Sequence, residues 1–156
     1  MTPRTNRYDV YRIQNVHLGV AREAFDRVVN LSGFQLRPTD QPYLWDFRHS
    51  HGGERGRLLH VEGFLGGTSI ALLPGSQAYL VEHKGKTRGL LFPPTPKRMR
   101  VNYEAHRVVP LEKLKGFPSH WPKQLVSKVL RVRIRDLVLL DQAFLLDITL
   151  RKQPAA

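Results

Sequence analysis

The 156-residue sequence contains no cysteine, which excludes a disulfide framework, a thiolate zinc site and a cysteine nucleophile. The lack of cysteine is typical of a reducing compartment, so we expect a cytoplasmic or other reducing intracellular location. The N-terminal stretch lacks the apolar run of a signal peptide, and the apolar region 137–150 is interrupted by Asp141, Gln142 and Asp147. We therefore expect neither secretion nor a membrane partner.

Acidic residues are scarce, since 13 Asp and Glu stand against 25 Lys and Arg, which gives a formal net charge of +12. The excess lies in one segment: residues 84–135 hold 14 Lys and Arg against 2 Asp and Glu, whereas residues 1–83 hold 9 against 8. Concentrated positive charge attracts polyanions. The length and the 41% of hydrophobic residues predict a single globular domain over residues 1–156 that carries the basic segment 84–135.

Hairpin signals dominate the chain and predict an α+β fold, mainly an antiparallel sheet or a partly closed β-barrel built from hairpins. One glycine-rich loop separates the strand-like stretches 43–50 and 57–65, and a second turn at 74–77 separates 68–73 from 78–84. The segment 20–33 has apolar residues at helical spacing, which predicts one N-terminal amphipathic helix. Short helices are expected near 110–128, where two prolines suit first helical turns.

Two short stretches place cations at alternate positions, which is the pattern of one basic face of a strand. The first row is Lys84, Lys86 and Arg88, and the second is Arg131, Arg133 and Arg135. Alternate residues of a strand lie about 6.6 Å apart, comparable to the spacing of phosphates along an extended or A-form strand. Such rows predict contacts with a phosphate backbone, for which the forked guanidinium donors of arginine are well suited.

The principal hypothesis is therefore a non-catalytic protein, without a cofactor, that binds RNA or single-stranded DNA through a basic sheet face. Single strands are also held by bases stacked on aromatic side chains, and Trp121, with prolines on both sides, is the most plausible exposed platform. Other subunits of a nucleoprotein complex are further expected partners. The predicted nucleic-acid-binding residues are Lys84, Lys86, Arg88, Arg98, Arg100, Tyr103, Trp121, Arg131, Arg133 and Arg135.

Two nuclease hypotheses stay open beside the binding protein. A metal-dependent nuclease would use the Glu-x-Lys sequence at residues 82–84 with a further acid at residue 62, and the carboxylates would hold a divalent metal ion. A metal-free ribonuclease would use a histidine as the general base and cations to stabilise the phosphorane. The candidate catalytic residues are His49, His51, His83, Glu62, Glu82 and Lys84.

A third hypothesis needs no nucleic acid. The same basic segment would let the chain act as a basic subunit that docks on an acidic protein partner. The residues leave open whether the ligand is RNA or DNA, whether the chain is catalytic, and which oligomer it forms.

Overall fold

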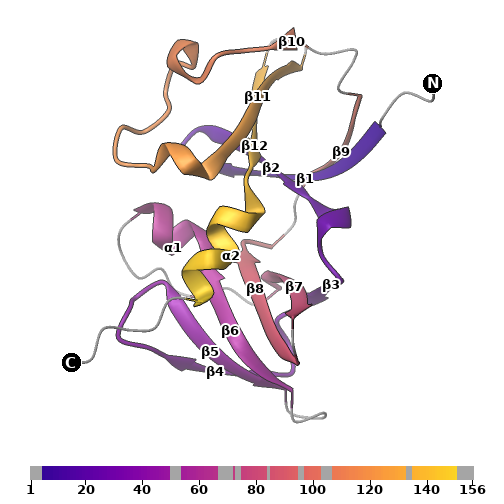
Figure 1. Ribbon diagram of the computed structural model, residues 1–156, viewed down its shortest axis with the longest axis vertical. Coiled ribbons are helices and arrows are strands. Elements are labelled where there is room, and N and C mark those ends of the chain that lie inside the picture. Colours follow the sequence, from indigo (N-terminus) through magenta and orange to yellow (C-terminus); the bar gives the residue numbers. More distant parts are fainter. Residues whose placement is uncertain are drawn as a thin grey trace. The chain divides into compact units, whose positions relative to one another are not determined.

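A computed structural model of the chain describes residues 5–49, 54–66, 72, 75–83, 85–94, 97–102, 107–132 and 135–150. The fold is mainly β, with two mixed sheets and two short α-helices (Figure 1). The expected α+β fold is therefore confirmed in part, because antiparallel hairpins dominate but helices contribute little. Among the described residues, no helix is long and apolar enough to cross a membrane.

The chain divides into two compact units, and each unit holds one six-stranded sheet. Unit 1 consists of Met1–Ala24 and Pro96–Gln142, and unit 2 consists of Phe25–Thr95 and Ala143–Ala156. Each unit is therefore assembled from segments that are distant in the sequence. The prediction of a single domain stays a prediction, because two units that share several chain crossings can still unfold together.

The sheet of unit 1 has the strand order β10-β11-β12-β2-β1-β9. Its pairs are antiparallel except for β12 and β2, which are parallel. Tyr8, Val10, Leu130, Leu137 and Leu139 form a buried cluster on one face. The strands are β1 (Thr5–Ile13), β2 (Val16–Ala21), β9 (Lys97–Asn102), β10 (Arg107–Val108), β11 (Val126–Val132) and β12 (Arg135–Leu140).

Short 3-10 helices lie where the sequence predicts short helices. Pro110 and Pro122 are the N-terminal capping residues of η2 (Leu111–Lys113) and η3 (Lys123–Leu125). Proline suits these positions because the first N–H groups of a helix have no hydrogen-bond acceptor within the helix, so the N–H that proline lacks is not needed there. The expectation of short helices near 110–128 is confirmed.

The sheet of unit 2 has the strand order β3-β7-β8-β6-β5-β4, and β6 and β8 are its parallel pair. The ion pair of Arg27 in β3 with Glu54 before β6 joins strands that are not neighbours, which shows that the sheet curls. The elements are β3 (Arg27–Asn30), β4 (Phe34–Pro38), β5 (Leu44–His49), β6 (Arg55–His60), α1 (Val61–Gly66), β7 (Gln77–His83), β8 (Lys86–Phe92) and α2 (Gln142–Leu150).

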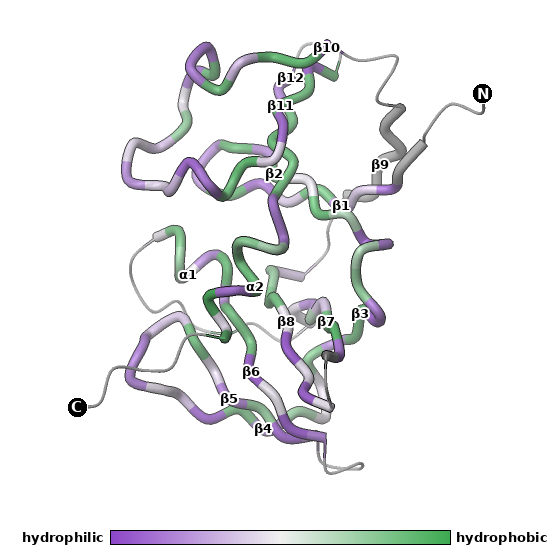
Figure 2. The backbone as a smooth tube through the Cα atoms, in the orientation of Figure 1, coloured by the Kyte–Doolittle hydropathy of each residue, from purple (hydrophilic) through white to green (hydrophobic). Residues whose placement is uncertain are grey.

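One face of this sheet forms the core of unit 2. Phe47, Leu58, Ala78, Leu80 and Leu91 form the buried cluster there, and their alternation along the strands puts their sequence neighbours on the other face. β6 and β8 both begin with hydrophilic residues and continue with leucines (Figure 2), and β6 then ends at the buried His60. Because the two strands are parallel, their hydrophilic starts lie side by side, and so do their leucines.

Two glycines permit close packing between neighbouring strands of this sheet, β6 with β8 and β8 with β7. A Cβ built on Gly56 would lie 2.1 Å from the Thr87 carbonyl oxygen, and one on Gly89 would lie 2.5 Å from the Tyr79 carbonyl oxygen. Real Cβ atoms do not approach backbone oxygens so closely, so a larger residue at either position would force the strands apart.

The predicted N-terminal helix over 20–33 is wrong. Residues 16–21 belong to β2, Arg22–Ala24 form the 3-10 helix η1, and Arg27–Asn30 form β3, which pairs with β7. The apolar spacing fitted a helix by coincidence, and sheet pairing of the β-branched Val28 and Val29 overrides that local pattern. Gly33 has φ of 89°, but it serves the turn between β3 and β4 and does not end a helix.

One of the two predicted hairpins is confirmed, and the other stays a prediction. β5 and β6 are antiparallel neighbours across the glycine-rich loop, although the second strand ends at His60, where α1 takes over. The strand 78–84 corresponds to β7, while most of its predicted partner 68–73 lies outside the described residues.

We predict that the two units unfold together, because each is assembled from distant segments of the chain. Trp121 lies in unit 1 and Trp45 in unit 2, so one tryptophan reports on each unit. In Trp45→Phe, the fluorescence of Trp121 and the far-ultraviolet circular dichroism of the whole chain should follow the same urea transition. Trp121→Phe, read through Trp45, is the reciprocal experiment. Non-coincident midpoints within one variant would show two independent domains.

Candidate functional site

The second predicted row of arginines is not a strand face. β11 ends at Val132 and β12 begins at Arg135, and Arg131 is paired in register with Asp136. Arg131 and Arg135 therefore point to opposite faces of a hairpin. The Arg131 Nε donates a hydrogen bond to Asp136 Oδ1 at 3.0 Å, and this bond raises the pKa of the Arg131 guanidinium. Arg133 lies outside the described residues.

The first predicted row also crosses a hairpin. β7 ends at His83 and β8 begins at Lys86, and these two residues are paired in register. Lys84 lies between them and outside the described residues. Lys86 and Arg88 do share one face of β8, so part of the predicted pattern is present.

The predicted stacking platforms do not support a nucleic-acid site. Trp121 is only 3% exposed, and its ring packs edge-on against Phe117 with centroids 5.5 Å apart. The prediction that Trp121 is exposed is wrong, because the 3-10 turn at Lys123–Leu125 and the adjoining strand turn the ring inward even though prolines flank it. Tyr103 lies outside the described residues, as do the side chains of Arg98 and Arg100 on β9.

The acids of the metal-dependent nuclease hypothesis lie at opposite ends of the strands. Glu82 in β7 is paired with Thr87, which is level with Gly56 at the start of β6. Glu62 lies in α1, beyond His60 at the end of β6. The four residue-to-residue steps from Gly56 to His60 alone span about 13 Å, so these carboxylates cannot hold one metal ion.

Of the three predicted histidine bases, the structure describes the side chain of His49 alone. His49 ends β5 and packs edge-on against Phe34, with ring centroids 5.0 Å apart. The side chain of His83 lies outside the described part of the chain, and so do the whole of His51 and Lys84. In the part of the chain that the structure describes, no three His, Asp or Glu side chains are grouped as a metal site would require.

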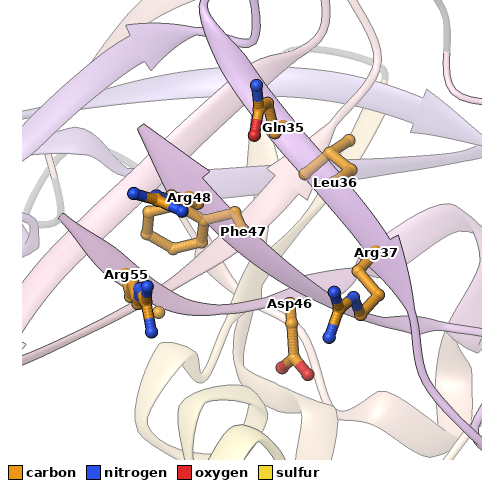
Figure 3. Close-up of a pocket in the computed structure, with 8 residues that line it drawn as sticks. Gln35, Leu36, Arg37, Asp46, Phe47, Arg48 and Arg55 are labelled. Carbon is orange, nitrogen blue, oxygen red and sulfur yellow. The ribbon is translucent and has the colours of Figure 1, made fainter. Parts of the chain in front are cut away.

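The structure instead gathers cations on unit 2, over the starts of β6 and β8. A cleft of about 590 Å³ is lined by Gln35–Arg37, Asp46–Arg48 and Arg55–Gly56. Figure 3 shows Arg37 and Asp46 extending from neighbouring strands to the same side. Arg37, Arg48 and Arg55 line this cleft, and register places Arg57, Lys86 and Arg88 on the same face of the sheet. We call these six residues together the cationic face.

Cross-strand register places these cations in two rows. In the first row, Arg37 is paired with Asp46, Asp46 with Arg57, and Arg57 with Arg88. In the second row, Arg48 is paired with Arg55, and Arg55 is level with Lys86, because the next residues of those two parallel strands are partners. Directly paired residues point to the same face of a sheet, so all six cations share one face.

The cationic face carries more positive charge than its one acidic neighbour, Asp46, can neutralise. Asp46 accepts a hydrogen bond from Arg57 Nε at 2.9 Å. Arg37, Arg48, Arg55 and Lys86 are exposed, and Arg88 is half-buried. Among the described residues, no ion pair involves the side chains of these five cations. Their charge is therefore available to a ligand.

Four of these six residues were not among the predicted binding residues. Arg37, Arg48, Arg55 and Arg57 come from the nearly neutral segment 1–83, whereas the prediction drew on the basic segment 84–135. The alternation of Arg55 and Arg57 before two leucines is a signal in the sequence that could have found half of that group. The contribution of β4 and β5 depends on pairing that no local pattern reveals.

Two buried polar atoms of unit 2 have no hydrogen-bond partner among the described residues, namely Trp45 Nε1 and His60 Nδ1. His60 is 5% exposed, and burial lowers the pKa of its imidazole below the ordinary value of 6.5. The ring is therefore neutral in the folded protein at neutral pH, and it is a structural histidine at the apolar end of β6.

No protein-family model matches the sequence, and no curated protein matches it significantly. The two compact units with their mixed six-stranded sheets form a CheW-like fold. The chain is similar to the scaffolding protein TtCheW from Thermoanaerobacter tengcongensis, with a TM-score of 0.60 and 11% sequence identity over 89% of this chain and 86% of that chain.

The predicted function as a nucleic-acid-binding protein is corrected by these findings. The fold is similar to that of a scaffolding protein, and this likeness contradicts RNA, single-stranded DNA and nucleoprotein subunits as the expected partners. The prediction failed because its two basic rows cross hairpins and its clearest aromatic platform is buried. Of the three hypotheses, docking on a protein partner agrees best with the comparison.

We predict that His60 makes the folded state less stable in acid. Its folded-state pKa is lowered, so as the pH falls through about 6.5 the unfolded chain binds a proton that the folded chain does not. His60→Leu should remove this loss, which amounts to at most about 1.4 kcal/mol per pH unit for one proton. Urea unfolding at pH 7.5 and 5.5 measures it.

The exposed His120 of unit 1 offers a matched control for that experiment. His120→Gln should keep the acid-dependent loss of the unaltered protein, because His60 is still present. An equal loss between pH 7.5 and 5.5 in His60→Leu and in the unaltered protein would contradict the prediction.

Proposed function

We propose that this chain is a non-enzymatic scaffolding protein that holds protein partners together. The observation that carries the proposal is the likeness to the scaffolding protein TtCheW over 89% of this chain and 86% of that one. A match over nearly the whole of both chains involves the complete fold and not one shared motif. Because the identity is 11%, the partners of this chain are argued from its own surface.

The arrangement of charged residues supports an adaptor better than an enzyme. The acids proposed for metal binding lie at opposite ends of the strands, and His49 packs against a phenylalanine ring. A scaffold needs no converging acid, base or nucleophile, but it needs stable surfaces. Unit 1 and unit 2 each have their own sheet, and each therefore offers a surface for a partner. The proposal includes an intracellular location, which was predicted from the lack of cysteine.

A bridging experiment tests the proposal. The tagged chain is expressed in its source cells, cross-linked mildly and purified after treatment with ribonuclease and deoxyribonuclease, and the co-purifying proteins are identified. We expect at least two proteins in near-stoichiometric amounts. When these proteins are then purified separately, they should form a joint complex only with the chain present, as measured by size-exclusion chromatography with light scattering.

Three results would overturn the proposal. The first is the loss of all co-purifying proteins on nuclease treatment, which would show that nucleic acid carried them. The second is cleavage of RNA or DNA by the purified chain that Glu82→Gln abolishes while the folded state survives. The third is that the partners bind each other equally well without the chain.

A further inference from the structure

The cationic face owes its position to strand direction. β6 begins with Arg55-Gly56-Arg57 and β8 with Lys86-Thr87-Arg88, and the pairing of Gly56 with Thr87 sets these starts level. β5 then adds Arg48, and the edge strand β4 adds Arg37. Neighbouring strands lie about 4.8 Å apart and alternate residues about 6.6 Å apart, so the face measures roughly 14 Å by 7 Å.

The size of the face restricts what it can bind. An area of this size is much smaller than a standard protein interface, so it suits a short extended segment and not a folded domain surface. Carboxylates at alternate positions of an extended segment are about 6.6 Å apart, which matches the spacing between the two cation rows. The face holds six cations and Asp46. Its net positive charge therefore favours a negatively charged partner.

Two features of the face favour an acidic protein segment over nucleic acid. Its positions on β4, β5, β6 and β8 carry no Phe, Tyr or Trp, so single-stranded bases find no stacking platform there. Asp46 stands in the middle of the first row, 2.9 Å from Arg57, where it would repel a run of phosphates. Unlike a phosphate backbone, a protein segment can place a cation or a neutral side chain opposite that carboxylate.

We propose that the cationic face of unit 2 is a docking site for an extended acidic segment of a partner protein, with carboxylates at alternate positions. The inference rests on the proposed scaffolding function, since it assigns one partner contact to one surface. Arg48 and Arg55, paired in register and exposed, hold a carboxylate of the segment at the second row, and the next alternate carboxylate reaches the cations of the first row. Arg57 contributes less, because Asp46 already accepts its hydrogen bond.

A labelled peptide of five Glu-Ser repeats tests the site by fluorescence anisotropy, with five Gln-Ser repeats as the uncharged comparison. We expect the acidic peptide to bind, the uncharged one not to bind, and the affinity to fall as salt is raised. Arg48→Glu with Arg55→Glu should weaken binding by about tenfold or more, because both paired cations are reversed. Arg48→Gln with Arg55→Gln, a gentler change, should weaken it in the same direction.

The matched control changes net charge equally on the other unit. Lys113 and Lys115 are exposed and lie in unit 1, so Lys113→Glu with Lys115→Glu should leave the affinity within about twofold, since neither residue belongs to the cationic face. Asp46→Asn should act in the opposite direction and tighten binding, because it removes the carboxylate and releases Arg57. Tryptophan fluorescence verifies that each variant is folded.

The outcomes separate the inference from the proposed function. Equal weakening in the Arg48/Arg55 and Lys113/Lys115 variants would show a general charge effect and overturn the docking site. Binding of a twelve-nucleotide RNA but not of the acidic peptide would also overturn it. If the co-purified proteins still assemble on a folded Arg48→Glu, Arg55→Glu chain as they do on the unaltered chain, the docking site is wrong while the scaffolding function stands. If no protein assembles on the unaltered chain, the scaffolding function itself fails.

Discussion

The parallel pairing of β6 with β8 is the constraint on which unit 2 depends. Both strands begin with charged residues and continue with buried leucines, so parallel alignment lets one sheet face be cationic at one end and buried at the other. An antiparallel pair would set the arginines of one strand beside the leucines of the other, and buried unpaired charge is costly. Gly56 makes this pairing possible, because a Cβ there would collide with the Thr87 carbonyl oxygen of β8, and Gly89 does the same for the pairing of β8 with β7, where the carbonyl oxygen is that of Tyr79.

Charge in this protein is organised by pairing and not by position along the chain. Arg131 and Arg135 belong to one dense basic stretch, yet the hairpin sends them to opposite faces and gives Arg131 an acidic partner in Asp136. Arg37 and Arg48 belong to a stretch with little net charge, yet they join Lys86 on the cationic face. A surface potential is thus a tertiary property, since hydrogen-bonded register decides which side chains are neighbours.

The CheW-like fold and the cationic face lead to one account of function. The likeness to a scaffolding protein covers 89% of this chain, and the two candidate acids Glu62 and Glu82 lie at opposite ends of the strands of unit 2. If the cationic face binds as proposed, its exposed arginines would give fast, salt-sensitive association, which suits the proposed scaffolding function. The buried neutral His60 of unit 2 is a structural residue of the core.

The sequence alone determined the local features of this protein. Hairpin turns, the 3-10 turns after Pro110 and Pro122, and the predominance of strands follow from residue preferences that act over a few positions. The sequence failed where the answer depended on distant pairing. The helical spacing of 20–33 lost to pairing of β3 with β7, and the alternating arginines at 131–135 crossed a turn that alternation cannot reveal. Only the tertiary structure placed Arg37, Arg48 and Arg55 together, because hydrogen bonds between strands far apart in the chain set their register.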